Sequence, residues 1–209
     1  MNSEKCRFCG QPLKHTFCDL GKSPVSNAFL NTDQLKKPEP FFPLHAKVCE
    51  SCFLVQVPVF ESPENNFHDY AYFSSYSASW VKHASDYTEK MIKRFGFNPS
   101  KSLVVEIASN DGYLLQHFKK HEIPVLGIEP AENVAEVARS TAKIPTIARF
   151  FGTELAKELA LEGKHADLLL GNNVLAHVPD LNDFVSGMKI LLKPNGIITM
   201  EFPHLLCLM

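Results

Sequence analysis

The chain has 209 residues, of which 45% are hydrophobic and 21% charged, and its formal net charge is −2. This composition is typical of a soluble globular protein, the length allows one ordinary domain plus a small one, and the balanced charge provides no basic surface for nucleic acid. No apolar run reaches the roughly 20 residues needed to cross a bilayer, and the N-terminal sequence MNSEKCRFCG has no apolar signal-peptide segment, so we expect a cytoplasmic protein without a membrane partner.

Two identical cysteine pairs stand near the N-terminus, Cys6-x-x-Cys9 and Cys49-x-x-Cys52. Each pair can present two thiolates to a metal ion from one tight turn, and two such turns complete the tetrahedral four-sulfur site that is typical of structural zinc. Reduced thiols are expected in the cytoplasm, which favours a metal over disulfide bonds. We therefore predict that residues 1–64 form a small zinc-binding domain, which folds around Zn²⁺ rather than around a large apolar core.

Short apolar runs without a helical period fill the rest of this domain. Residues 47–48 and 53–57 flank the second cysteine pair and predict two short strands of a hairpin like that of a zinc ribbon. Residues 24–43, between the pairs, predict an extended excursion with one helical turn near residues 32–35.

A segment rich in aromatic and hydroxyl side chains, NNFHDYAYFSSYSAS, covers residues 65–79. Apolar side chains then recur at helical intervals from Trp80 to Phe95, and Gly96 follows as a stop signal. We expect residues 65–100 to contain this aromatic segment and a linking helix. The aromatic side chains could equally form an apolar cluster between two domains.

Strands and helices alternate from residue 101 onward. Single helices between strands imply right-handed crossovers, and therefore a parallel sheet with helices on both faces. The sequence predicts a doubly wound, Rossmann-like α/β domain over residues 101–209. The expected strands are residues 103–107, 125–128, 144–147, 168–170 and 196–201, and the expected helices are residues 112–120, 132–140, 154–162 and 183–192.

The first expected strand runs into the sequence EIASNDG, residues 106–112, and then directly into a helix. Small residues at Ala108 and Gly112 would let the backbone approach a ligand, and the helix N-terminus offers N–H groups to a carboxylate. The spacing differs from G-x-G-x-x-G, which disfavours a dinucleotide, while Glu129 follows the second strand, where a carboxylate can accept both hydroxyls of a ribose. A ribose and an amino-acid-like end together indicate S-adenosylmethionine (SAM). Taken separately, the loop could be an ordinary turn, and Glu129 could cap the next helix.

Several segments are similar to those of one known family: VVEIASNDGYLL, VLGIEP, FFG, LLLGNNVLAHVPD, DYAYFSSYS and EFPHLL, together with the two cysteine pairs. They resemble the nucleotide-deoxysugar C-methyltransferases, which are class I SAM-dependent enzymes with an N-terminal zinc-binding domain. The resemblance extends over essentially the whole chain, and the combination of segments is specific, although VEIASNDG alone would indicate only a class I methyltransferase.

The resemblance implies which residues hold the cofactor and the substrate. The methionine end of SAM would be lined by Glu106, Ala108, Asn110 and Gly112, the ribose would be held by Glu129, the adenine would lie near Phe150 and Phe151, and further contacts would come from Asn172 and Asn173. His177 and the tyrosines Tyr70, Tyr72 and Tyr76 would act at the sugar, orienting it or donating to its enolate. His177 could instead cap the helix that follows.

The resemblance also implies a reaction. Family members methylate a carbon next to the ketone of a thymidine-diphosphate 4-keto sugar, which requires a general base and polar groups that stabilise an enolate. Their sequences continue beyond EFPHLL with a Tyr-x-Glu-His segment that is central to catalysis, whereas this sequence stops at Met209. We therefore expect a C-terminally truncated version of the enzyme, with a nucleotide sugar as its partner; the sequence does not indicate an oligomeric state.

Two alternatives stay open from the sequence. One is a non-catalytic fragment that binds zinc and SAM. The other is a zinc-ribbon methyltransferase of nucleic acid, which predicts a basic face and a Pro-Pro-Tyr-like turn after the fourth strand; this chain has Gly171-Asn172-Asn173-Val174 there.

Overall fold

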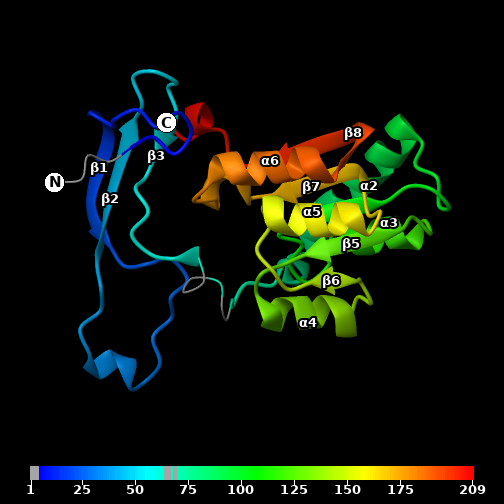
Figure 1. Cartoon of the computed structure of the whole chain (residues 1–209). Helices are drawn as coiled ribbons and strands as arrows, with labels where there is room; N and C mark the ends of the chain where they lie inside the picture. Colours follow the sequence, from blue (N-terminus) through cyan, green and yellow to red (C-terminus); the bar gives the residue numbers. More distant parts are fainter. Residues whose placement is uncertain (1–4, 64–66, 68–69) are drawn as a thin grey trace. The chain divides into compact units, whose positions relative to one another are not determined.

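The structure is a computed structural model that describes residues 5–63, 67 and 70–209. The chain divides into two compact units (Figure 1): unit 1 comprises Met1–Phe67 with Pro179–Asn182, and unit 2 comprises His68–Val178 with Asp183–Met209. The boundary predicted between residues 64 and 65 lies outside the described residues.

Unit 1 contains a three-stranded antiparallel sheet in the order β1-β2-β3. Strand β1 covers His15–Ser23, β2 covers Phe42–Val48 and β3 covers Val55–Gln56, and a short 3-10 helix, η1, covers Gln34–Lys36. The β2–β3 hairpin around the second cysteine pair confirms the predicted one, whereas β1 was not predicted. The core is very small and includes metal-binding side chains: it consists of Cys6, Leu13 and Cys49, with Cys52 and Leu54 packed against it.

Unit 2 contains a five-stranded sheet in the order β6-β5-β4-β7-β8, and all of its strand pairs are parallel. This order confirms the predicted doubly wound fold and places the switch point between β4 and β7. The elements follow in chain order: η2 (Ser74–Tyr76), α2 (Ala78–Phe95), β4 (Val104–Ile107), α3 (Leu115–Lys120), β5 (Val125–Ile128), α4 (Glu132–Ser140), β6 (Thr146–Ile147), α5 (Thr153–Leu161), β7 (Ala166–Asn172), η3 (Leu175–His177), α6 (Leu181–Leu191), β8 (Leu192–Glu201) and η4 (Leu205–Cys207).

Both faces of the sheet are covered by helices. Successive strand residues point to opposite faces, so Val104 and Leu168 pack with side chains of α2 and α3. Their neighbours Val105 and Leu169 pack on the other face with side chains of α5 and α6. Burial on both faces explains why the strands are continuous apolar runs rather than alternating ones, and it leaves the loops at the strand ends to form a site.

Helix α2 begins and ends at recognisable capping residues. The Ser77 side chain accepts a hydrogen bond from the backbone N–H of Trp80, and Gly96 ends the helix in the left-handed conformation at φ 62°. The predicted helix from Trp80 to Phe95 is thereby confirmed to within two residues of its start. Although α2 has 18 residues, neither it nor any other helix in the described part of the chain is apolar enough to cross a membrane.

Candidate zinc centre and cofactor site

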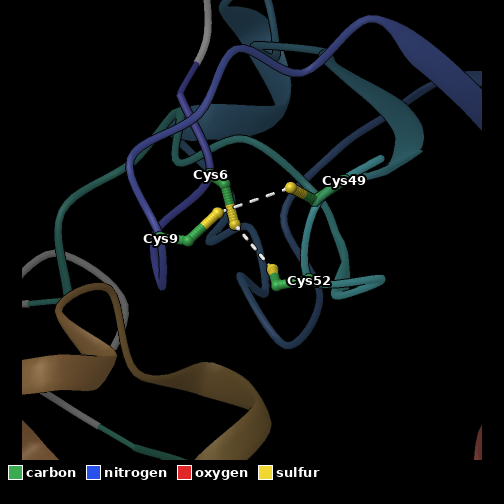
Figure 2. Close-up of side chains that lie close together, drawn as sticks. All are labelled: Cys6, Cys9, Cys49 and Cys52. Carbon is green, nitrogen blue, oxygen red and sulfur yellow. Dashed lines mark hydrogen bonds between the residues drawn. The ribbon is translucent and has the colours of Figure 1, made fainter.

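The two cysteine pairs converge on one point in unit 1. The sulfur atoms of Cys6, Cys9, Cys49 and Cys52 all lie within 4.8 Å of one another (Figure 2). The Cys6–Cys52 sulfur distance is 3.6 Å and the Cys9–Cys49 distance is 3.5 Å. A tetrahedral site with zinc–sulfur bonds of about 2.3 Å requires sulfur–sulfur distances of about 3.8 Å. The four thiols therefore fit a Zn²⁺ ion, and they are the residues that would hold it.

The two turns that carry these cysteines have the same backbone geometry. Gly10 donates its N–H to the carbonyl of Cys6 at 2.9 Å, and Phe53 donates to the carbonyl of Cys49 at the same distance. Gly10 and Phe53 both have positive φ, at 74° and 61°. Each Cys-x-x-Cys sequence is thus followed directly by a left-handed residue that closes the turn, and this turn directs the two sulfur atoms to one side.

The pKa values of two of the cysteines shift in opposite directions. Burial would raise the pKa of Cys6, but hydrogen bonds from the Cys9 backbone and the Gln56 side chain outweigh it and lower the pKa to about 6. Cys52 shifts in the opposite direction. The Leu54 backbone N–H lowers its pKa, yet burial and the neighbouring sulfur of Cys6 raise it to about 12. Four thiolates so close together repel one another, and a divalent cation removes that repulsion.

The loop after β4 has an unusual backbone. Residues Ala108, Asn110 and Gly112 have positive φ values of 56°, 49° and 80°. An α-helix requires negative φ at successive residues, and every second residue here has positive φ. The helix that was predicted from Gly112 therefore begins only at Leu115, the first residue of α3. Left-handed conformations are uncommon for residues with a side chain, and strained residues of this kind cluster at functional sites.

Glu106, at the end of β4, is fully buried, and neither of its carboxylate oxygens has a hydrogen-bond partner among the described residues. Burial, together with the nearby charges of Glu129 and Asp111, raises the pKa of Glu106 well above its ordinary value. A buried acid without a partner is costly. A positively charged ligand group at this position would remove the cost, so Glu106 fits the ammonium-bearing end of SAM.

Glu129 lies directly after β5 and is also buried. One carboxylate oxygen accepts the backbone N–H of Asn110 at 3.0 Å, and the other accepts that of Ala131 at 2.9 Å. The carboxylate thus links the loop after β4 to the start of α4, whose N-cap residue is Ala131 rather than Glu129. Each oxygen keeps a further lone pair, so the same carboxylate can still accept hydroxyl groups.

Two asparagine side chains, one in the loop after β4 and one in α4, bind the backbone of the aromatic segment. Asn110 accepts the backbone N–H of Ser74 at 2.8 Å and donates to the carbonyl of Tyr72 at 3.1 Å. Asn133, in α4, accepts the N–H of Tyr70 at 3.2 Å and donates to its carbonyl at 2.9 Å. The backbone of residues 70–75 therefore runs beside the loop, and both ends of the Asn110 amide are used for this contact.

Polar side chains also meet at the end of β7. Asn172 donates to the Tyr113 hydroxyl at 3.1 Å, and the backbone N–H of Asn173 donates to the carbonyl of Glu201 at 2.7 Å. Burial and the charge of Glu106 raise the pKa of Tyr113, which keeps its hydroxyl protonated. Because β4 and β7 are neighbours at the switch point, Asn172, Tyr113 and Glu106 lie at the same edge of the sheet.

The remaining predicted residues differ in exposure. Tyr72 and Tyr76 are 51% and 84% exposed, and His177 is exposed at the end of η3. Phe150 is 43% exposed, whereas the Phe151 ring packs edge-on against Phe184 of α6 with the ring centroids 5.3 Å apart. The structure thus brings the loop after β4, Glu129 and the aromatic segment together, while Phe151 belongs to the core on the α5–α6 face.

Sequence analysis missed several residues of the site: Asn133, Ser74, Asp111, Tyr113 and Gln56. Asp111 and Tyr113 lie inside the recognised loop and could have been included on that ground. The sequence around Asn133 and around Gln56 does not distinguish either residue from an ordinary polar one. Both form hydrogen bonds with atoms of distant segments: Asn133 with backbone groups, and Gln56 with a cysteine sulfur.

Comparison with known proteins identifies two families in this chain. Residues 6–67 match a family described as "Putative zinc binding domain", and residues 105–198 match one described as "Methyltransferase domain". The first range contains all four clustered cysteines, and the second contains Glu129, β7 and all of β4 except its first residue.

Individual relatives agree with this assignment. C-methyltransferase NovU from Streptomyces niveus is 31% identical over 202 residues, covering 97% of this chain and 48% of the relative. Ubiquinone biosynthesis O-methyltransferase from Bartonella tribocorum is 24% identical over 143 residues, covering 66% of this chain and 56% of the relative. The chain therefore spans about half the length of these curated relatives.

Among solved structures, the PH0226 protein from Pyrococcus horikoshii has a similar fold, with a TM-score of 0.52, 22% sequence identity, and coverage of 66% of this chain and 60% of the other. The resemblance seen in the sequence agrees with these comparisons: the chain combines a region that matches a zinc-binding domain with a Rossmann-like region that matches a methyltransferase domain, and it is similar to a protein named as a C-methyltransferase.

Proposed function

We propose that this protein transfers a methyl group from SAM to a carbon atom next to the ketone of a nucleotide-activated 4-keto deoxysugar, as the sequence resemblance implies. The observation that carries the proposal is the similarity to a protein named as a C-methyltransferase, which extends over 97% of the chain and so takes in both units. We also propose the division into a zinc-binding domain (residues 1–64), an aromatic linking segment (65–100) and a SAM-binding domain (101–209).

The acidic residues around the loop after β4 support the cofactor part of this proposal. SAM has a sulfonium and an ammonium group, and when bound it supplies an electrophilic methyl group. We assign Glu106 to the ammonium-bearing end, because its carboxylate is buried without a partner in the described part of the chain. We assign Glu129 to the ribose hydroxyls, because its oxygens stand at the end of β5 with lone pairs left over.

Exposed polar side chains support the acceptor part. A carbon next to a ketone becomes nucleophilic when a base removes its proton and a donor stabilises the enolate oxygen. Tyr72, Tyr76 and His177 are exposed, and each can donate a hydrogen bond. We assign these side chains to orienting the sugar and donating to the enolate oxygen, in line with the family resemblance.

The cofactor assignment is tested by calorimetric titration of the chain with SAM. Glu129→Ala should weaken binding at least about tenfold, because charge-assisted hydrogen bonds contribute about 1.5–3 kcal/mol each. Glu154→Ala is the matched control, since this glutamate lies in the first turn of α5 with its side chain 88% exposed. Equal SAM affinity of the two variants would remove Glu129 from the ribose site.

The acceptor assignment is tested separately, by incubating the protein with a thymidine-diphosphate 4-keto deoxysugar in heavy water. The hydrogen on the carbon next to the ketone should exchange with solvent, and methyl-labelled SAM should transfer its label to that carbon. If the label is found on an oxygen atom, or if methyl transfer occurs with no exchange of that hydrogen, the proposed carbon methylation is overturned. Neither result would contradict the assignment of the SAM site.

A further inference from the structure

Gln56 connects the two halves of the zinc centre. It lies in β3, directly after the second cysteine turn, and is only 8% exposed. Its amide nitrogen donates to the sulfur of Cys6 at 3.2 Å, and its amide oxygen accepts the backbone N–H of Arg7 at 2.9 Å. Both partners belong to the first cysteine turn, so one side chain from the strand that follows the second turn holds the first turn in place.

The orientation of this amide is fixed by chemistry. With the nitrogen and oxygen exchanged, the oxygen would face the electron-rich sulfur of Cys6, and the nitrogen would face the N–H of Arg7. Both contacts would be repulsive. The nitrogen also lies 3.4 Å from the carbonyl of Leu54, a second acceptor on the same side. The observed orientation is therefore the one that satisfies every group.

A donor at this sulfur matters because of the charge of the site. Four thiolates around one Zn²⁺ leave an excess of negative charge on the sulfur atoms, and Cys6 is buried, so water cannot compensate for it. Hydrogen bonds from groups around a metal orient its ligands and tune their donor strength. A side-chain donor can be removed by mutation, whereas a backbone donor cannot.

We propose that Gln56 is a positioning residue of the zinc centre, which holds the Cys6 sulfur for the metal and lowers its electron density through an N–H···S hydrogen bond. Zinc affinity then depends on a residue that is not a ligand. The two cysteine turns are aligned by the Gln56 side chain in addition to the metal itself.

Competition between the whole chain and a chromophoric chelator for zinc tests this proposal. Gln56→Glu keeps an acceptor for the Arg7 N–H and replaces the donor to Cys6 with an oxygen, so zinc binding should weaken about 10- to 100-fold. Gln34→Glu is the control, because it makes the same change at an exposed position of η1 in the same unit. In the cobalt-substituted protein, the sulfur-to-metal charge-transfer band of the Gln56→Glu variant should move to lower energy.

Gln56→Met separates the hydrogen bond from the added charge, since it removes the donor without introducing a carboxylate. It should also weaken zinc binding and shift the cobalt band in the same direction. The proposal is overturned if Gln56→Met binds zinc as the wild type does with an unshifted band, even where Gln56→Glu fails to take up metal. It is equally overturned if Gln56→Glu and Gln34→Glu cannot be distinguished.

Discussion

Replacing Gly112 with alanine should destabilise unit 2 by an amount that can be worked out from two separate effects. Gly112 has φ 80°, and a Cβ atom there would lie 2.9 Å from Ile144 Cγ1 and 3.3 Å from Ala142 Cβ. The left-handed conformation costs a residue with a Cβ about 1–2 kcal/mol, and forcing an extra carbon into a packed core costs about 1–3 kcal/mol. The expected loss in the free energy of unfolding is therefore about 2–5 kcal/mol.

Gly163 shows the conformational effect alone. Its φ is 75°, but a Cβ there meets nothing within 4 Å, so Gly163→Ala should lose only the conformational part, about 1–2 kcal/mol. The lower entropy of the unfolded chain is the same for both substitutions and cancels in the comparison.

Urea unfolding followed by the fluorescence of Trp80 measures both variants, because the chain contains a single tryptophan and it packs against the core of unit 2. The reasoning is refuted if Gly112→Ala is no less stable than Gly163→Ala.

Three other predictions concern the cysteine cluster, Glu106 and Asn133. Alanine at Cys9 or Cys52 should abolish stoichiometric zinc in elemental analysis and unfold unit 1, because a structural zinc contributes about 10–16 kcal/mol; retention of one equivalent of metal by both would contradict the four-sulfur site. Glu106→Gln should stabilise the cofactor-free chain near neutral pH. Because the folded state raises the pKa of Glu106 above its ordinary value of 4.5, the contribution of Glu106 to stability is fully present when the pH is below 4.5. This contribution is lost as the pH rises through the folded-state pKa. A Trp80 unfolding curve with the same pH dependence in wild type and variant would rule that out. Asn133→Ala should speed hydrogen exchange at the Tyr70 amide while the midpoint of global unfolding changes little, and an unchanged exchange rate would show that this contact does not hold the segment.

The fold of unit 2 could be predicted because its strands and helices are each determined locally. The strand at residues 125–128 and the helix at residues 132–140 are observed with the predicted bounds, since apolar runs and helical periodicity follow directly from burial. Strand β8 begins at Leu192 rather than at Gly196. Its early part contains Pro194, which carries no signal for a strand.

Contacts between distant segments could not be predicted in the same way. The paired cysteines indicated a metal site because four like residues with a fixed spacing are rare by chance. Strand β1 lacks such a signal, since its side chains are mostly exposed and do not alternate. The hydrogen bonds of Asn133 and Gln56 depend on segments 63 and 50 residues away, and a single sequence contains no pattern that connects them.

The attachment of the aromatic segment has a consequence for how substrate preference can change. In the described part of this segment, Asn110 and Asn133 bind main-chain groups of residues 70–74, and every residue other than proline provides such groups. Tyr72 and Tyr76 can therefore be exchanged for other side chains without loss of these hydrogen bonds. Main-chain groups fix the segment, whereas exposed side chains would face an acceptor molecule. Substitutions at a few exposed positions would therefore change the surface offered to an acceptor without changing how the segment is held.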